Sequence, residues 1–211
     1  RLIRLREDSR SIFEAAVKAV SPEEAVRHHL RVEGMELALA RGDGGEEKLD
    51  LRKFNRLFIM GGGKACAPMA RAVEEILGDR VSGGVVVVKY GHGEPLRRVE
   101  LCEAGHPVPD EAGQTGAQRI LNLLNSTGET DLILCLLSGG GSALLPLPVE
   151  GVTLQEKQEM TRLLLACGAD IHETNTVRKH ISRIKGGQLA RAAYPSTVVN
   201  LILSDVIGDD L

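Results

Sequence analysis

Aromatic residues are scarce in this chain of 211 residues, which has no Trp, two Tyr and three Phe. The chain also lacks a large excess of charge of either sign. Its 26 Lys and Arg nearly balance its 29 Asp and Glu, and the formal net charge is -3. A nucleic-acid-binding protein typically has a basic face, and binding of single strands adds aromatic platforms for the bases. The composition therefore argues against nucleic acid as a partner.

Long apolar runs and closely spaced cysteines are missing as well. The longest apolar stretches, residues 85–88 and 132–137, have the length of strands and fall well short of the ~18 residues that suggest a membrane-spanning helix. The first ten residues are charged throughout, unlike a signal peptide. Cys66, Cys102, Cys135 and Cys167 match no metal-binding spacing and are expected to be buried thiols in a reducing compartment. We expect a cytoplasmic protein without a membrane span.

The first 50 residues are predicted to be mostly helical. Apolar residues recur at helical spacing between positions 12 and 20. Ser21 and Pro22 then have the residue types of a helix N-cap and first turn. Residues 41–48 combine glycines with charges and predict a surface loop.

From residue 51 onward, short apolar runs alternate with amphipathic segments. Strands are predicted at 57–60, 85–89, 99–103, 132–137 and 198–203, and helices at 67–77, 111–125, 154–167 and 176–193. Nearly continuous apolar strands indicate burial on both faces, which favours an α/β fold with a mostly parallel sheet between helices. We expect one domain over residues 1–211, with 51–211 forming its α/β part. The character of both ends suggests a piece of a longer protein.

Glycine is the residue in excess, with 24 in the chain against a usual share of about 7%. Three clusters come directly after predicted strands: Gly61-Gly62-Gly63-Lys64, Tyr90-Gly91-His92-Gly93 and Ser138-Gly139-Gly140-Gly141-Ser142. Open α/β sheets bind ligands at the carboxyl ends of their strands, where glycine-rich turns let backbone amides converge on an anion. The clusters therefore predict a phosphate or carboxylate site.

Neither cluster with Lys or Ser fits a standard nucleotide-binding motif. A Walker A loop needs the pattern G-x-x-x-x-G-K-[ST], and Ala65 stands where Ser or Thr is required after the Lys. A dinucleotide fingerprint starting at Gly61 or Gly139 needs glycine at positions 66 or 144, which are Cys66 and Leu144. Tight packing between strand and helix is the alternative explanation for any single glycine-rich turn.

Other candidates lie in the last third of the chain. Asp205 comes after the predicted strand at 198–203 and is a candidate for binding Mg²⁺ or a substrate hydroxyl, with helix capping as the alternative. Arg178 and Lys179 belong to a basic helical segment that could reach a phosphate or simply face solvent. His92 and His106 could face the same edge of the sheet, but neither is predicted to be catalytic.

Several of these segments together resemble the class II glycerate kinases. The matching segments are Gly61-Gly62-Gly63-Lys64-Ala65, Lys89-Tyr90-Gly91-His92-Gly93, Gly105-His106-Pro107-Val108-Pro109-Asp110, Ser138-Gly139-Gly140-Gly141-Ser142-Ala143, Asn175-Thr176-Val177-Arg178-Lys179, Lys185-Gly186-Gly187 and Ser204-Asp205-Val206. The C-terminal part of proteins in this glycerate 2-kinase family is called MOFRL, and some members are labelled hydroxypyruvate reductase. The match runs in family order from about residue 57 to the end.

The resemblance implies a Rossmann-like three-layer αβα domain that transfers phosphate from ATP to D-glycerate, with Mg²⁺, giving 2-phosphoglycerate. It also implies a cleft whose second wall is the family's C-terminal domain, absent here, so the chain alone is expected to be inactive. We assign Lys64 to the transferring phosphoryl group or the substrate carboxylate, and Asp205 to Mg²⁺ or the glycerate hydroxyl. Binding roles are assigned to Gly61, Gly62, Gly63, Ser138, Gly139, Gly140, Gly141, Ser142, Arg178 and Lys179.

Two other functions remain open. The first is an NAD(P)H-dependent hydroxypyruvate reductase, against which the two failed fingerprints stand. The second is a non-catalytic domain that binds a sugar phosphate or a carboxylate. Turnover of hydroxypyruvate with NADH would favour the first, and tight binding without turnover would favour the second.

Overall fold

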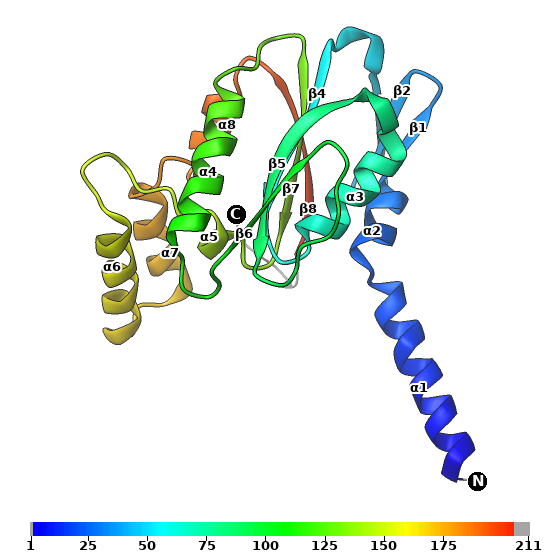
Figure 1. The fold of residues 1–211 in the computed structure, drawn as a ribbon, viewed down its shortest axis with the longest axis horizontal. Coiled ribbons are helices and arrows are strands. Elements are labelled where there is room, and N and C mark those ends of the chain that lie inside the picture. Colours follow the sequence, from blue (N-terminus) through cyan, green and yellow to red (C-terminus); the bar gives the residue numbers. More distant parts are fainter. Residues whose placement is uncertain (1, 205–211) are drawn as a thin grey trace.

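The computed structural model describes residues 2–204 and contains two sheets surrounded by helices (Figure 1). The N-terminal part has α1 (Leu2–Ala19), α2 (Pro22–His29), β1 (Leu30–Glu33), β2 (Glu36–Ala40), β3 (Glu46–Asp50) and the 3-10 turn η1 (Leu51–Lys53). The α/β part continues with β4 (Arg56–Gly62), α3 (Cys66–Leu77), η2 (Gly78–Arg80), β5 (Val81–Lys89), β6 (Glu100–Ala104), α4 (Glu111–Leu124) and β7 (Asp131–Ser138). It ends with α5 (Gly141–Leu144), α6 (Leu154–Ala166), α7 (Ile171–His180), α8 (Gln188–Ala193) and β8 (Thr197–Leu203).

The larger sheet has five parallel strands in the order β6-β5-β4-β7-β8. This order confirms the predicted parallel α/β fold, and all five predicted strands are present. The strands β5, β4 and β7 are neighbours, so their carboxyl ends lie side by side at one edge of the sheet. We call this the carboxyl edge.

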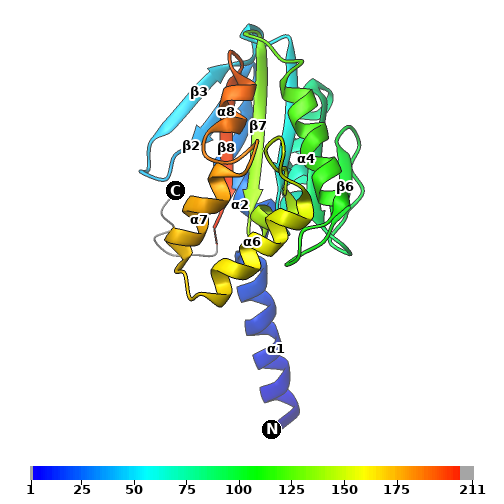
Figure 2. The same ribbon diagram turned by 90° about the vertical axis from the view of Figure 1, so that its left-hand side faces the viewer.

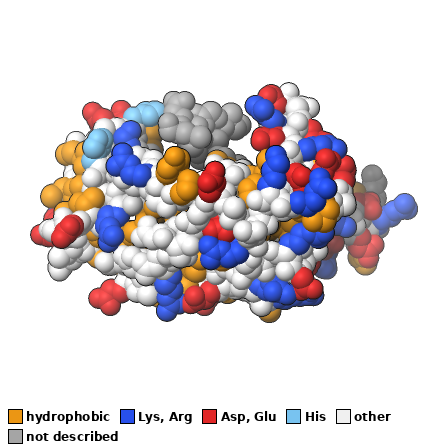
Figure 3. All heavy atoms as spheres, turned by 90° about the horizontal axis from the view of Figure 1, so that it is seen from above, with side chains coloured by type: hydrophobic (Ala, Val, Ile, Leu, Met, Phe, Trp, Pro, Cys, Tyr) orange, Lys and Arg blue, Asp and Glu red, His pale blue; other side chains and the backbone are white. Residues whose placement is uncertain are grey.

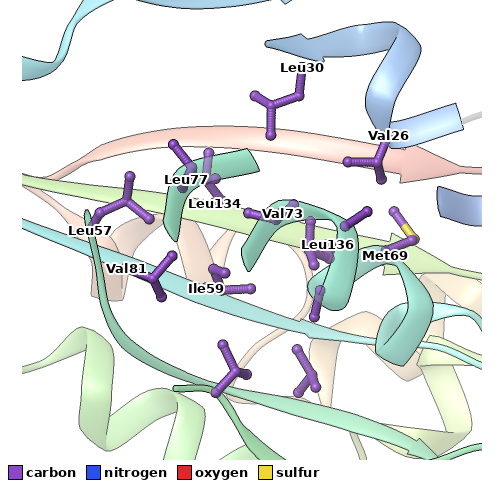
Figure 4. Packing of buried hydrophobic residues seen from close by; sticks show 14 of the residues in the cluster. Val26, Leu30, Leu57, Ile59, Met69, Val73, Leu77, Val81, Leu134 and Leu136 are labelled. Carbon is purple, nitrogen blue, oxygen red and sulfur yellow. The ribbon is translucent and has the colours of Figure 1, made fainter. Parts of the chain in front are cut away.

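Side chains alternate between the two faces of the sheet, as expected for strands buried on both sides. On one face, Ile59 and Leu134 pack against α3 and, beyond it, α2 and β1 (Figure 4). On the other face, Met60 and Ile133 pack against α4, with Leu144 of α5 in the same cluster. The two clusters fix the helices on both faces and hold the carboxyl edge in place.

The structure differs from the sequence prediction after His29. Residues 30–50 form a small antiparallel sheet, β1-β2-β3, instead of helix and loop. The β1–β2 turn contains Gly34, whose φ of 65° lies in the left-handed region favoured by glycine. The predicted surface loop is confined to the β2–β3 turn, because β3 already begins at Glu46.

A second difference lies in the helix predicted at 176–193. The structure has α7 ending at His180 and α8 beginning at Gln188, with a segment of turns and bends between them. In that segment Ser182 forms an isolated antiparallel β-bridge with Pro148, and the Arg183 amide donates a hydrogen bond to Leu147 O at 3.0 Å. Pairing with residues 147–149 therefore replaces a helical turn, and Ser182 and Arg183 do not share a helix face with Arg178 and Lys179.

The predicted helix starts are largely confirmed. Ser21 caps α2 and Asp110 caps α4, and Thr153 and Glu156 form a capping box at α6. Such caps satisfy backbone amides that have no partner within the helix. The cysteines are only partly as predicted, because Cys66 and Cys135 are buried thiols but Cys167 is exposed. No helix described between residues 2 and 204 is both long and apolar enough to cross a bilayer.

Candidate functional site

Two of the glycine-rich loops interlock at the carboxyl edge. The Lys64 amide donates to Gly139 O at 2.9 Å and so ties the loop after β4 to the loop after β7. The Gly63 amide donates to Val87 O on β5 at 3.0 Å. The structure thus brings together the loops that the sequence placed after these strands.

The glycines in these loops serve different purposes. Gly61 and Gly62 belong to β4 and are buried, and a Cβ on Gly61 would lie 1.9 Å from Leu136 O on β7. Close strand packing, the alternative considered from the sequence, therefore explains Gly61. Gly140 has a φ of 88°, and a Cβ there would lie 2.9 Å from the His106 ring and 3.5 Å from Lys64 Cε. Gly140 thus lets the loop approach two basic side chains.

Lys64 and His106 are neighbours at this edge, both partly exposed. Partial burial lowers the pKa of His106, and the positive charges of Lys64, Lys89 and His92 lower it further. These groups come from the ends of β4, β5 and β6, which the sheet order places together. An anion placed among them would be attracted to several positive charges at once.

The two serines of the second loop have different partners. Ser138 Oγ accepts a hydrogen bond from the Ala65 amide at 3.0 Å, so this serine helps to join the loops. Ser142 is exposed, and its Oγ accepts a hydrogen bond from Arg178 Nη2 at 2.8 Å. Arg178 on α7 is therefore held at the start of α5, where the sequence predicted anion binding.

Arg178 belongs to a cluster of three cations that includes Lys157 on α6 and Lys185 after α7; we call it the α6–α7 cation cluster. Lys157 is only 3% exposed, and its Nζ donates to Ile181 O at 3.1 Å. Burial and the charge of Arg178 lower the pKa of Lys157 to about 8. Burial lowers the pKa of Lys185 to about 7, with Arg178 and Lys157 contributing.

Among the ion pairs found within residues 2–204, none involves Lys64, Lys157, Arg178 or Lys185. At the end of the molecule opposite the carboxyl edge, by contrast, positive and negative side chains are interspersed on the surface (Figure 3). Neighbouring cations without carboxylate partners destabilise one another, and a bound anion relieves that repulsion. The arrangement suits a phosphate or a carboxylate.

The structure gives less information about the remaining residues that were predicted for the site. Lys179 is exposed and its stem lies beside Gly186, where a Cβ would be 3.5 Å from Lys179 Cβ. Asp205, predicted to bind Mg²⁺ or the glycerate hydroxyl, lies outside the described residues, as do Asp209 and Asp210. The assigned roles of all these residues stay predictions.

The third glycine cluster differs from the other two. The amides of Gly91 and Gly93 both donate to Glu103 Oε1, at 2.9 and 3.3 Å. Tyr90 Oη donates to Asp110, which also caps α4. These amides already bind a carboxylate of the protein itself, so the turn is explained by its internal hydrogen bonds.

The donor groups of the structure bear on metal binding. Within residues 2–204, no group of three or more His, Cys, Asp or Glu side chains is arranged to hold a metal ion. Mg²⁺ is commonly bound through one or two carboxylates together with substrate phosphates. The cations among the described residues therefore suit the substrate phosphates with which Mg²⁺ would be bound. Asp205 remains the predicted protein ligand of the metal.

Two of the cations in the site were missed by the sequence reasoning. Lys157 has no role in the sequence prediction, and Lys185 is part of the segment Lys185-Gly186-Gly187 that matches the family but has no predicted role in the site. The signal for Lys157 was slight: it occupies the buried position of α6, where helical spacing would favour an apolar residue. Its partner carbonyl, Ile181 O, lies 24 positions away in the sequence.

The chain is similar to several known proteins. A family model described as "Domain of unknown function (DUF4147)" matches residues 8–211. A Thermotoga maritima protein named D-glycerate 2-kinase is 45% identical over 201 residues, covering 95% of this chain and 44% of the relative. An Agrobacterium vitis protein named putative hydroxypyruvate reductase is 44% identical over 205 residues, covering 97% of this chain and 42% of the relative.

Two crystal structures are also similar. A Pyrococcus horikoshii protein aligns with a TM-score of 0.84 and 43% identity, over 98% of this chain and 45% of that one. A glycerate kinase from Thermotoga maritima aligns with a TM-score of 0.80 and 43% identity, over 98% and 46% of the two chains. The chain spans less than half the length of these relatives. It belongs to the class II glycerate kinase family, and its residues correspond to that family's N-terminal domain.

Proposed function

We propose that the full-length protein transfers the γ-phosphoryl group of ATP to D-glycerate, giving 2-phosphoglycerate and ADP. The reaction would take place in a cleft of which the carboxyl edge forms one wall. The observation that carries the proposal is that Lys64 and Arg178 lie at two interlocked glycine-rich loops, with Lys157 and Lys185 near Arg178, and that none of the four has an ion-pair partner within residues 2–204. The relatives named as glycerate kinases support the choice of reaction.

The residues of this chain would act mainly by positioning and by neutralising charge. Phosphoryl transfer spreads negative charge over the transferring group and its neighbours, so fixed cations and amides stabilise the transition state. Lys64 would contact the transferring phosphoryl group or the glycerate carboxylate. The loop from Ser138 to Ser142 would hold nucleotide phosphates, with Arg178 directed to it through Ser142.

Mg²⁺, when bound with ATP, would neutralise phosphate charge, and Asp205 would hold it or orient the glycerate hydroxyl. Lys157 lies too deep to be a contact residue at 3% exposure and would act through its neighbours. Lys179 is assigned a supporting role towards anionic groups near the loop. These assignments divide the site into a glycine-loop part and the α6–α7 cation cluster.

The second candidate is a hydroxypyruvate reductase that uses NAD(P)H, because an Agrobacterium vitis relative carries that name. Its dinucleotide would need the close backbone approach that a third fingerprint glycine provides. Cys66 occupies that position and is fully buried, with its thiol donating to Leu136 O at 3.3 Å. A non-catalytic binding domain is the third candidate, and turnover of substrate by the full-length protein would exclude it.

Replacing Lys64 tests the proposal directly. In the full-length enzyme, Lys64→Ala should lower kcat/KM for D-glycerate phosphorylation by about 100-fold or more, since it removes a cation from the developing negative charge. The matched control is Lys53→Ala, which removes an exposed lysine just before the amino end of β4. The control should leave kcat/KM unchanged.

A loss of less than about threefold in Lys64→Ala would remove Lys64 from catalysis. The same preparations should be incubated with hydroxypyruvate and NADH. NADH consumption that equals or exceeds ATP-dependent phosphorylation of glycerate would overturn the kinase assignment.

A further inference from the structure

Helix α1 carries an apolar surface that nothing in the described structure covers. None of its residues is buried, and it projects away from the rest of the molecule in both ribbon views (Figures 1 and 2). Five of its large apolar residues lie on one side of the helix and are between 52% and 76% exposed: Leu2, Leu5, Ile12, Phe13 and Val17. We call this set the α1 stripe. In proteins most of the stability of a helix comes from tertiary packing of its apolar face, so α1 is expected to need such contacts.

The width of the α1 stripe indicates the kind of surface that it fits. A coiled-coil seam that starts at Leu2 would continue through Leu5, Ser9, Ile12 and Ala16, and two of these five residues are too small or polar to pack well. The large residues Phe13 and Val17 lie beside such a seam and widen the stripe. A broad stripe is typical of a helix packed on a globular domain, whereas pairing of helices needs the narrow seam.

The position of α1 indicates where that domain lies. In both views α1 extends past the end of the sheet at which β7 and β8 end, which is the end that carries the glycine-rich loops (Figures 1 and 2). The relatives are more than twice as long as the part that this chain matches. A second domain placed over the carboxyl edge would therefore lie next to α1.

We propose that the α1 stripe is the docking surface for the second domain of the full-length protein and holds that domain over the carboxyl edge. The proposal rests on the proposed function only in placing the second domain at that edge. Burial of the stripe would remove five large side chains from water, a favourable contribution to the interface. The residues of α1 would touch neither substrate nor nucleotide, and would act by setting the position of the second wall of the cleft.

Hydrogen exchange in the full-length protein, followed by mass spectrometry, tests the proposal. If the stripe is covered, amides of residues 5–17 should exchange at least about tenfold more slowly than expected for an uncovered helix. Phe13→Glu should remove this protection, because it places a charge in the apolar interface. Ser11→Glu is the matched control: it adds the same charge two positions away, about 200° around the helix, and should leave protection unchanged.

Three results would overturn the proposal: unprotected α1 amides in the full-length protein, equal effects of Phe13→Glu and Ser11→Glu, or protection that is lost on dilution to a single-chain species. The last would assign the stripe to a second copy of the chain, and protection only with anionic phospholipid vesicles would assign it to a membrane surface. The readout does not depend on activity. Protection that Phe13→Glu removes, in a protein without kinase activity, would keep this inference and contradict the proposed function.

Discussion

Lys157 combines a charged group with almost complete burial, and its ammonium donates to a backbone carbonyl. Its protonated form is therefore poorly solvated, and the charge of Arg178 destabilises it further. Such an arrangement weakens the fold and is typical of a functional site, where stability is given up for binding. Below its lowered pKa, Lys157 adds positive charge to the α6–α7 cation cluster, ready for an anion.

Lys157→Met should therefore stabilise the protein near pH 7 by about 1 kcal/mol or more, because a poorly solvated charge is replaced by an apolar side chain of similar length. Ile181 O keeps a donor in the variant, the Val149 amide at 3.3 Å. Urea unfolding of the full-length protein measures the change. The exposed control Lys53→Met should alter the free energy of unfolding little.

The pH dependence of this gain has a definite sign. Lys157 has a pKa of about 8 in the folded protein, below its ordinary 10.5, so the unfolded state binds more protons between these values. The wild-type protein should gain stability as pH rises through this window, and the advantage of Lys157→Met should shrink. An advantage that stays constant from about pH 7 to about pH 10 would contradict the buried, destabilised ammonium.

At the scale of single residues, the sequence predicts the position of the site residues that belong to a recognisable pattern. Lys64 and Ser142 stand beside glycine runs at strand ends, so their place at the carboxyl edge could be predicted. Lys157 could not, because a lysine within an amphipathic helix normally faces solvent. Its burial results from the segment after α7 that lies against α6, and that packing has no local signal.

Among the secondary-structure elements, α3 has a role beyond covering the sheet. Its Glu74 is 5% exposed, and its carboxylate accepts hydrogen bonds from the amides of Arg97, Arg98 and Val99 at 2.8, 2.7 and 2.9 Å. These amides directly precede β6, which lies at the edge of the sheet. One buried carboxylate therefore anchors the entry to β6 and, through it, the order of strands at the site.

Glu74→Ala should lower the free energy of unfolding by about 3 kcal/mol or more, because three backbone amides lose a charged acceptor in a buried place. Glu74→Gln should lose less, since its amide oxygen still accepts. The neighbouring exposed Glu75 provides the control, because its contact with Arg27 is a surface ion pair and Glu75→Ala should cost less than about 1 kcal/mol. Equal losses in Glu74→Ala and Glu75→Ala would contradict the anchoring role.

The elements themselves were predicted where hydrophobic patterns were long and regular. All five strands of the parallel sheet could be predicted from their apolar runs. The break between α7 and α8 could not, because Val177, Ile181 and Ile184 keep a helical spacing across it and pairing with residues 147–149 overrides that local preference. The small sheet had a signal in the alternation of Leu37 and Leu39 with small residues, but the strong helix start at Ser21 favoured a longer helix.

For the whole molecule, the carboxyl edge carries the partly exposed Lys64 and the exposed Ser142 with its partner Arg178, while α1 extends past the same end (Figure 2). Both features are explained if a second domain covers this edge in the full-length protein. The sequence predicted an α/β domain and an anion site from glycine runs and apolar strands. It could not predict the direction of α1, because an amphipathic pattern specifies which face is buried and leaves the partner open.

Phosphorus NMR of the reaction products tests the central claim most directly. The full-length protein, supplied with D-glycerate and Mg-ATP, should produce ADP and 2-phosphoglycerate, because the cations at the carboxyl edge are proposed to stabilise phosphoryl transfer. The Lys64→Ala variant, measured beside it, should form the same product far more slowly. Unchanged ATP in the wild-type reaction, or phosphate attached to the 3-hydroxyl of glycerate, would contradict the account.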